Sequence, residues 1–184
     1  VYGLADLSRT RVSEKGQMVK VDILSPAELL KLNDALIPVS CHELGCGAAT
    51  YLTSRLLHEF RRTKRYNHEF SCIAIRVGKL REITANEAKI DALKLVSRQI
   101  CLSIRNTDEI FYLNEGVFVV LAPETMANRV KTLSTRIIRE IHGFFQIQAP
   151  EFADLQIRAG TFSFDGRNAE DHNQILTNAL DSCH

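Results

Sequence analysis

The residues of this chain best suited to chemistry are an arginine and an aspartate three positions apart, Arg105 and Asp108. An arginine guanidinium can donate two parallel hydrogen bonds to guanine O6 and N7 or to a phosphate. A carboxylate can accept hydrogen bonds from guanine N1 and N2. The pair could therefore read a guanine nucleotide, although the same residue types can also form a solvated surface ion pair worth about 0–1 kcal/mol.

Hydrophobic periodicity predicts the elements that position this pair. A helical stripe over 90–104 ends at the Arg105–Asp108 turn, and two β-rich segments around a polar tip with Gly116 predict a hairpin. The hairpin strands are expected over 110–113 and 117–121, further helices over 52–60, over 126–141 with a stop at Gly143, and from Ala169, and further strands over 70–77 and 155–164. This order predicts an α+β fold with a central, mainly antiparallel sheet flanked by helices.

Composition limits the classes of partner. The chain has 184 residues, is 45% hydrophobic and carries a formal net charge of +1, which favours one packed core and gives no bulk attraction to nucleic acid or membrane. It has no apolar run of about twenty residues, so a cytoplasmic location is expected. Five cysteines and six histidines lack paired or metal-binding spacing, so we expect reduced thiols, no metal and no cofactor.

The hairpin resembles that of the diguanylate cyclase (GGDEF) family. In that family an Arg-x-x-Asp motif stands a few residues before a tip that reads Gly-Gly-Asp/Glu-Glu-Phe, and here Arg105 and Asp108 precede the tip Asn114 to Phe118. Looser marks are the segments 61–66, 118–123 and 175–179. The resemblance covers residues 41–184 and implies the cyclase-like fold. It also implies cyclic di-GMP as ligand, with Arg136 as a third binding residue from the following helix.

The same resemblance places unexpected residues where a cyclase needs its chemistry. The family's metal-binding acid in the first strand falls at Arg76, and its tip acids fall at Gly116 and Val117. A permanent cation opposes a divalent metal, which prefers carboxylate oxygens. The family's base-binding segment corresponds to 42–50, where its acid, asparagine and arginine are replaced. The sequence therefore predicts that the chain is not an enzyme.

Together these observations predict a catalytically inactive GGDEF domain that acts as a cyclic di-GMP receptor through Arg105, Asp108 and Arg136. The expected output is a signal passed to a protein partner, and the ligand could bridge a homodimer. Two alternatives stay open: a nucleotide-independent interaction or dimerisation scaffold, and a residual cyclase that uses Glu115. Nucleic acid and membrane are not expected as partners.

Residues 1–40 differ from the rest and are expected to be an N-terminal extension or the remnant of an upstream module. Alternation predicts strands over 1–7 and 17–24, and Ser25-Pro26 is a typical helix start. Asp6 and Ser8 faintly resemble the Asp-x-Ser motif of PilZ cyclic-dinucleotide receptors. The GGDEF-like domain itself is expected over 41–184.

Overall fold

The computed structural model describes residues 10–12, 18–20 and 40–183. Strands β1 (Thr10–Val12) and β2 (Met18–Lys20) pair antiparallel, and β2 falls inside the strand expected over 17–24. The strand expected over 1–7, the helix start at Ser25 and the PilZ-like Asp6 and Ser8 lie outside the described residues. The domain boundary at residue 40 therefore stays a prediction.

A five-stranded sheet of order β3-β5-β6-β4-β7 forms the centre of the part of the chain that the structure describes. Its strands are β3 (Gly47–Ala48), β4 (Phe70–Gly78), β5 (Glu109–Asn114), β6 (Val117–Pro123) and β7 (Gln156–Phe164). β3 pairs parallel with β5, and the other pairs are antiparallel. The predicted mainly antiparallel sheet is confirmed. β3 was not predicted, because two residues are too few to show a period.

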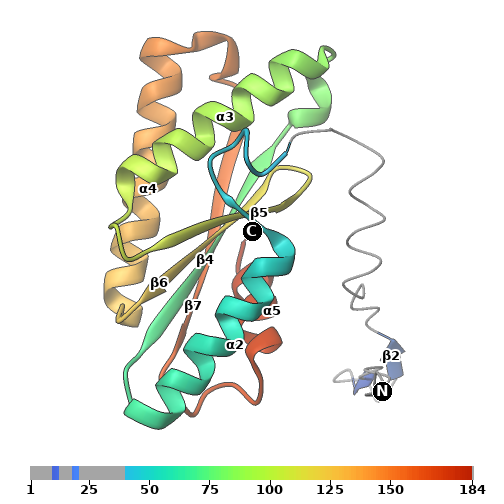
Figure 1. Ribbon diagram of the computed structural model, residues 1–184. Coiled ribbons are helices and arrows are strands. Elements are labelled where there is room, and N and C mark those ends of the chain that lie inside the picture. The colour runs from blue at the N-terminus through green and yellow to red at the C-terminus, as the bar shows by residue number, and fades with distance from the viewer. Residues whose placement is uncertain (1–9, 13–17, 21–39, 184) are drawn as a thin grey trace.

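Four helices of the described region cover the two faces of this sheet (Figure 1). Helices α2 (Ala49–Tyr66) and α5 (His172–Asp181) pack on one face, and α3 (Asn86–Ser103) and α4 (Ala127–Gln148) pack on the other. Strand β4 supplies both cores, since Ile73, Ile75 and Val77 face α3 and α4 while Phe70, Cys72 and Ala74 face α2 and α5. This alternation follows from the period of two in a strand, and the predicted α+β fold class is confirmed.

Helix α4 is longer than predicted. Its expected stop at Gly143 is wrong, because the helix continues to Gln148. Phe145 is fully buried and extends the stripe of Ile137 and Ile141 by another turn. Its burial against the core outweighs the cost of a helical glycine, which is about 1 kcal/mol relative to alanine.

The five cysteines are all free and differ widely in exposure. Cys101 is exposed, whereas Cys72 is completely buried and this burial raises the pKa of its thiol to about 12. At pH 8 only about one Cys72 thiol in ten thousand would be ionised, and the thiolate is the reactive form. Iodoacetamide at pH 8 is thus expected to label Cys101 and leave Cys72 unlabelled in the folded protein. Mass-spectrometric mapping checks this result, and equal labelling of both would contradict the burial of Cys72.

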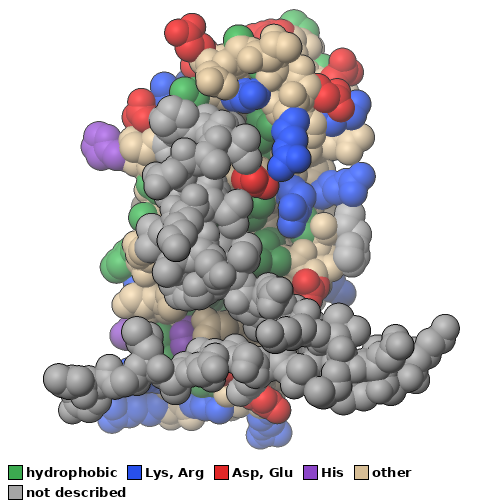
Figure 2. All heavy atoms as spheres, turned by 90° about the vertical axis from the view of Figure 1, so that its right-hand side faces the viewer, with side chains coloured by type: hydrophobic (Ala, Val, Ile, Leu, Met, Phe, Trp, Pro, Cys, Tyr) green, Lys and Arg blue, Asp and Glu red, His purple; other side chains and the backbone are tan. Residues whose placement is uncertain are grey.

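Charge is unevenly spread despite the near-zero net value. Figure 2 shows several Lys and Arg side chains gathered in the upper part of the face it presents. Within the described residues, no helix combines the length and the apolar character needed to cross a bilayer. Attraction for an anionic ligand therefore depends on where individual arginines converge.

Candidate functional site

The turn that follows α3 is closed by its own polar groups. The backbone N–H of Asp108 donates to the Arg105 carbonyl at 3.0 Å, and the Arg105 backbone N–H donates to Asp108 Oδ2 at 2.9 Å. A short acidic side chain that bonds a nearby backbone N–H is a common way to fix such a turn. Asp108 is buried, with 9% of its surface exposed, whereas Arg105 is exposed beside it. The predicted turn is present, and its acid is held in one orientation.

Arg136 reaches the same turn from α4. Its guanidinium donates a hydrogen bond of 2.5 Å to the carbonyl of Ser103, the last residue of α3. The final carbonyls of a helix have no partner within the helix, and a cation there also interacts favourably with the helix dipole. This contact brings Arg136 beside the turn that carries Arg105 and Asp108.

All three predicted residues line one open cavity of about 340 Å³. That volume lies within the range of small-molecule sites. Sequence reasoning missed the other lining residues, which are Thr125, Asn128, Arg129, Thr132 and Leu133. Most of them recur at helical spacing with Arg136 along α4, so the period of 3.6 residues could have identified this face.

The lining of the cavity is strongly cationic. Arg105, Arg129 and Arg136 surround it, and Asp108 is the one carboxylate among the residues that line it. Arginines bind phosphate oxygens through paired hydrogen bonds, and a buried carboxylate accepts from the N–H groups of guanine. The arrangement suits a ligand that combines phosphate with guanine.

A second open cavity, of about 500 Å³, lies at the loop before α2. It borders β5 and is lined by His42, Gly45, Cys46, Gly47, Tyr51, Glu109, Ile110 and Phe111. No arginine or lysine is among these lining residues, and most of the surface they expose is apolar. An anionic nucleotide is therefore better matched to the arginine-lined cavity.

The tip of the β5–β6 hairpin holds the residues expected to replace the cyclase chemistry. Arg76 is exposed on β4 and lies opposite Val117 on β6 and Arg158 on β7. Glu115 has a φ of 46° and forms an ion pair with Arg81 at 3.6 Å. Gly116 has a φ of 79°, a left-handed conformation that favours glycine, and a Cβ there would lie only 3.1 Å from the Val77 carbonyl oxygen.

The carboxylates and other ligating side chains of this region do not form a metal cluster. In the stretch from 40 to 183 and the two short strands before it, no three His, Cys, Asp or Glu side chains stand close enough together to hold a metal ion. Burial raises the pKa of Tyr112, whose hydroxyl accepts a hydrogen bond from the Gly116 N–H at 3.2 Å. The hydrogen bond between Gly116 and Tyr112 ties the tip of the hairpin to β5.

The chain has the fold of GGDEF domains. No protein-family model matches its sequence, and no curated protein sequence matches it either. Its structure is similar to the GGDEF domain and coiled coil of DgcB from Caulobacter crescentus in complex with c-di-GMP. The TM-score is 0.68 at 10% sequence identity, over 84% of this chain and 81% of that one.

Two further solved structures are enzymes with the same fold. One is the diguanylate cyclase SiaD from Pseudomonas aeruginosa in complex with its activator SiaC, with a TM-score of 0.66, 16% identity and 83% of this chain covered. The chain spans 58% of the SiaD chain. The other is the active GGEEF domain of a diguanylate cyclase from Vibrio cholerae, with a TM-score of 0.66 and 17% identity over 75% of this chain and 88% of that one.

These structures correct one prediction. The prediction that the chain is not an enzyme is contradicted, because the solved structures that share its fold include two diguanylate cyclases. That Arg76, Gly116 and Val117 stand where the family has its acids stays a prediction from the resemblance. A fold by itself does not assign an activity, so the proposed function rests on the chemistry of the arginine-lined cavity.

Proposed function

We propose that this chain binds cyclic di-GMP in the arginine-lined cavity, with Arg105, Asp108 and Arg136 as its principal contacts. The observation that carries the proposal is that these three residues, from separate parts of the chain, line the same cavity. An arginine and an aspartate that follow α3 share one cavity with an arginine that lies 28 residues after Asp108 and on another helix. Surface ion pairs do not need a cavity, whereas a ligand site does.

Each contact has a distinct role in this proposal. Asp108 already accepts one backbone hydrogen bond, and its carboxylate has capacity left for guanine N1 and N2. The exposed guanidinium of Arg105 donates to guanine O6 and N7, since two donors on one plane match that edge. Arg136 keeps its bond to Ser103 and offers its remaining N–H groups to a phosphate.

Binding is proposed to act as a signal. SiaD is seen with a protein activator and DgcB with c-di-GMP, and we extend both properties to this chain as part of the proposal. The ligand would bridge two copies of the chain or expose a surface to a protein partner, in the cytoplasm. The open cavity supports this reading because a bound ligand would remain accessible from outside.

A thermal-shift panel tests the proposal. Cyclic di-GMP at a hundred times its dissociation constant is expected to add about 2.7 kcal/mol to the free energy of unfolding. Cyclic di-AMP is the matched control, because it carries the same phosphates and a base that Asp108 cannot read in the same way. Equal shifts with both would contradict the guanine contact, and no shift with either would favour the scaffold alternative. Product formation from GTP and Mg²⁺, assayed in the same preparation, measures cyclase activity directly.

A further inference from the structure

Two turns border the arginine-lined cavity and lie at the same end of the hairpin. The first ends at Asp108 and leads into β5, and the second follows the end of β6 at Pro123 and contains Glu124 and Thr125. Because β5 and β6 are antiparallel, with Glu109 opposite Leu121, the start of one strand lies beside the end of the other. Asp108 and Thr125 are both buried and both line the cavity.

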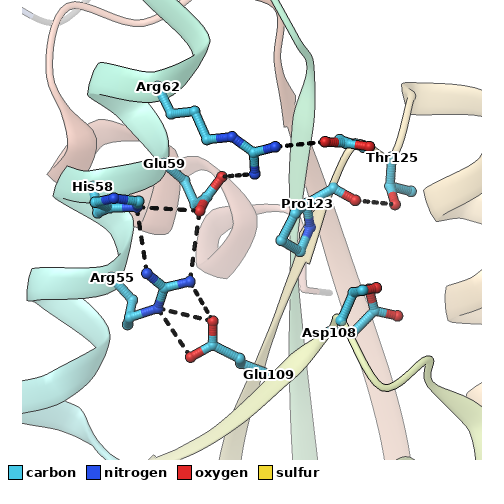
Figure 3. A network of polar contacts seen from close by, with 10 residues as sticks. Arg55, His58, Glu59, Arg62, Asp108, Glu109, Pro123 and Thr125 are labelled. Atoms are coloured by element: carbon cyan, nitrogen blue, oxygen red, sulfur yellow. Dashed lines mark hydrogen bonds and ion pairs between the residues drawn. The ribbon is translucent and has the colours of Figure 1, made fainter.

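Helix α2 binds both turns through arginines. Arg55 donates to the Glu109 carboxylate from Nε at 2.8 and 3.0 Å and from a terminal nitrogen at 2.5 Å. Arg62, two helical turns further on, donates to Glu124 at 2.5 Å. Figure 3 shows the two arginines reaching from α2 toward these turns, with Asp108 beside Glu109. Each acid is the immediate neighbour of a residue that lines the cavity.

One buried carboxylate joins the two arginines. Glu59 lies between them on α2 with 5% of its side chain exposed, and its oxygens are 3.5 Å from Arg55 and 3.4 Å from Arg62. The His58 ring is also 3.3 Å from it. A buried carboxylate without counter-charges is costly in free energy. Because Arg55 and Arg62 neutralise Glu59, these contacts hold both guanidinium groups on this side of the helix.

The second turn is held by bonds of its own and by one contact with α2. Glu124 has a φ of 51°. This left-handed conformation is energetically unfavourable for any residue other than glycine. The Thr125 carbonyl accepts from Ser71, and the Thr125 hydroxyl donates to the Pro123 carbonyl. The Arg62 contact is the link from this turn to α2, while the Arg55 contact is the corresponding link from the first turn.

We propose that Glu59 is a positioning residue of the cavity, which fixes the separation of the Asp108 and Thr125 turns by holding Arg55 and Arg62. The consequence for ligand affinity depends on the proposed function, whereas the coupling of the two turns does not. In the reverse direction, a ligand between the turns restrains α2. Glu59 thus links the cavity to a helix that contributes no residue to its lining.

Hydrogen exchange of the free protein tests the coupling without any ligand. Glu59→Gln is expected to speed exchange at the amides of 106–109 and of 124–126 together, by about tenfold. Glu140→Gln makes the same chemical change in an exposed ion pair on α4 and is expected to leave both segments as in the wild type. Faster exchange confined to α2, or no change, would overturn the proposal.

Two single-arm variants keep the test decisive if Glu59→Gln does not fold. Arg55→Met is expected to speed exchange mainly at 106–109, and Arg62→Met mainly at 124–126, because each breaks one contact with a turn. If either variant loosened both turns equally, general destabilisation would explain the data and the proposal would fail.

A ligand arm separates this inference from the proposed function. If the wild type binds cyclic di-GMP, Glu59→Gln is expected to weaken binding by about tenfold, and equal affinity would overturn the positioning role. If the wild type does not bind cyclic di-GMP, the proposed function fails. The exchange experiment on the free protein would still decide whether Glu59 couples the two turns.

Discussion

Replacing Arg136 by alanine is expected to weaken the binding of cyclic di-GMP by about ten- to a hundredfold, which corresponds to the loss of a good paired contact. Arg136 lines the cavity and is aligned by its bond to Ser103. Arg139→Ala removes the same charge from the same helix at a residue that is absent from the lining, has 73% of its side chain exposed and pairs with Glu140. Fluorescence anisotropy with a labelled ligand measures both affinities.

A further variant separates binding from helix capping. Arg136→Ala also removes a bond to the end of α3, so part of its effect could act through the fold. Arg129 lines the same cavity and is exposed, so Arg129→Ala is expected to weaken binding with little change in the free energy of unfolding. Equal weakening by Arg139→Ala would mean that overall charge, rather than this cavity, attracts the ligand.

Gly160→Ala is expected to lower the free energy of unfolding by about 2–4 kcal/mol, because the site has no room for a methyl group. A Cβ at Gly160 would lie within 3.0 Å of backbone atoms of Ala179, Ser182 and Cys183, at the end of α5. Backbone cannot rotate away as a side chain can, so α5 would have to move off the sheet. Urea denaturation measures the loss.

Gly143→Ala is the matched control for this substitution. A Cβ at Gly143 meets nothing within 4 Å, and the residue lies inside α4. Alanine is the better helix former there, so the free energy of unfolding is expected to rise by about 0.5–1 kcal/mol. A loss at Gly143 similar to that at Gly160 would show that the α5 contact does not set the cost.

The pattern of apolar residues along the sequence predicted much of the fold, because it is clear in several helices and strands. The short apolar run of β4 and the helical stripe that ends in the Arg105 turn both appear where expected. Two of the differences have clear physical causes. β3 has two residues and exists because β5 offers it a parallel partner, and α4 passes Gly143 because Phe145 gains a buried position beyond it. Both depend on tertiary contacts.

The residues of the candidate site also fall into those that the sequence identified and those that only the structure shows. Arg105, Asp108 and Arg136 were identifiable from the family resemblance, and the chemistry of arginine and aspartate suits the guanine nucleotide that the resemblance implies. Arg129 shares the face of α4 that carries Arg136 but resembled an ordinary charged surface residue. Glu59 could not be found from sequence, because the two arginines that it contacts bind acids 54 and 62 residues further along the chain than themselves.

The most direct test of the central claim is a calorimetric titration of cyclic di-GMP into the wild-type chain, with GTP titrated in parallel. We expect saturable binding of cyclic di-GMP that is lost when Asp108 and Arg105 are both replaced by alanine. An absence of binding heat at several temperatures, or binding that the double substitution leaves unchanged, would contradict it.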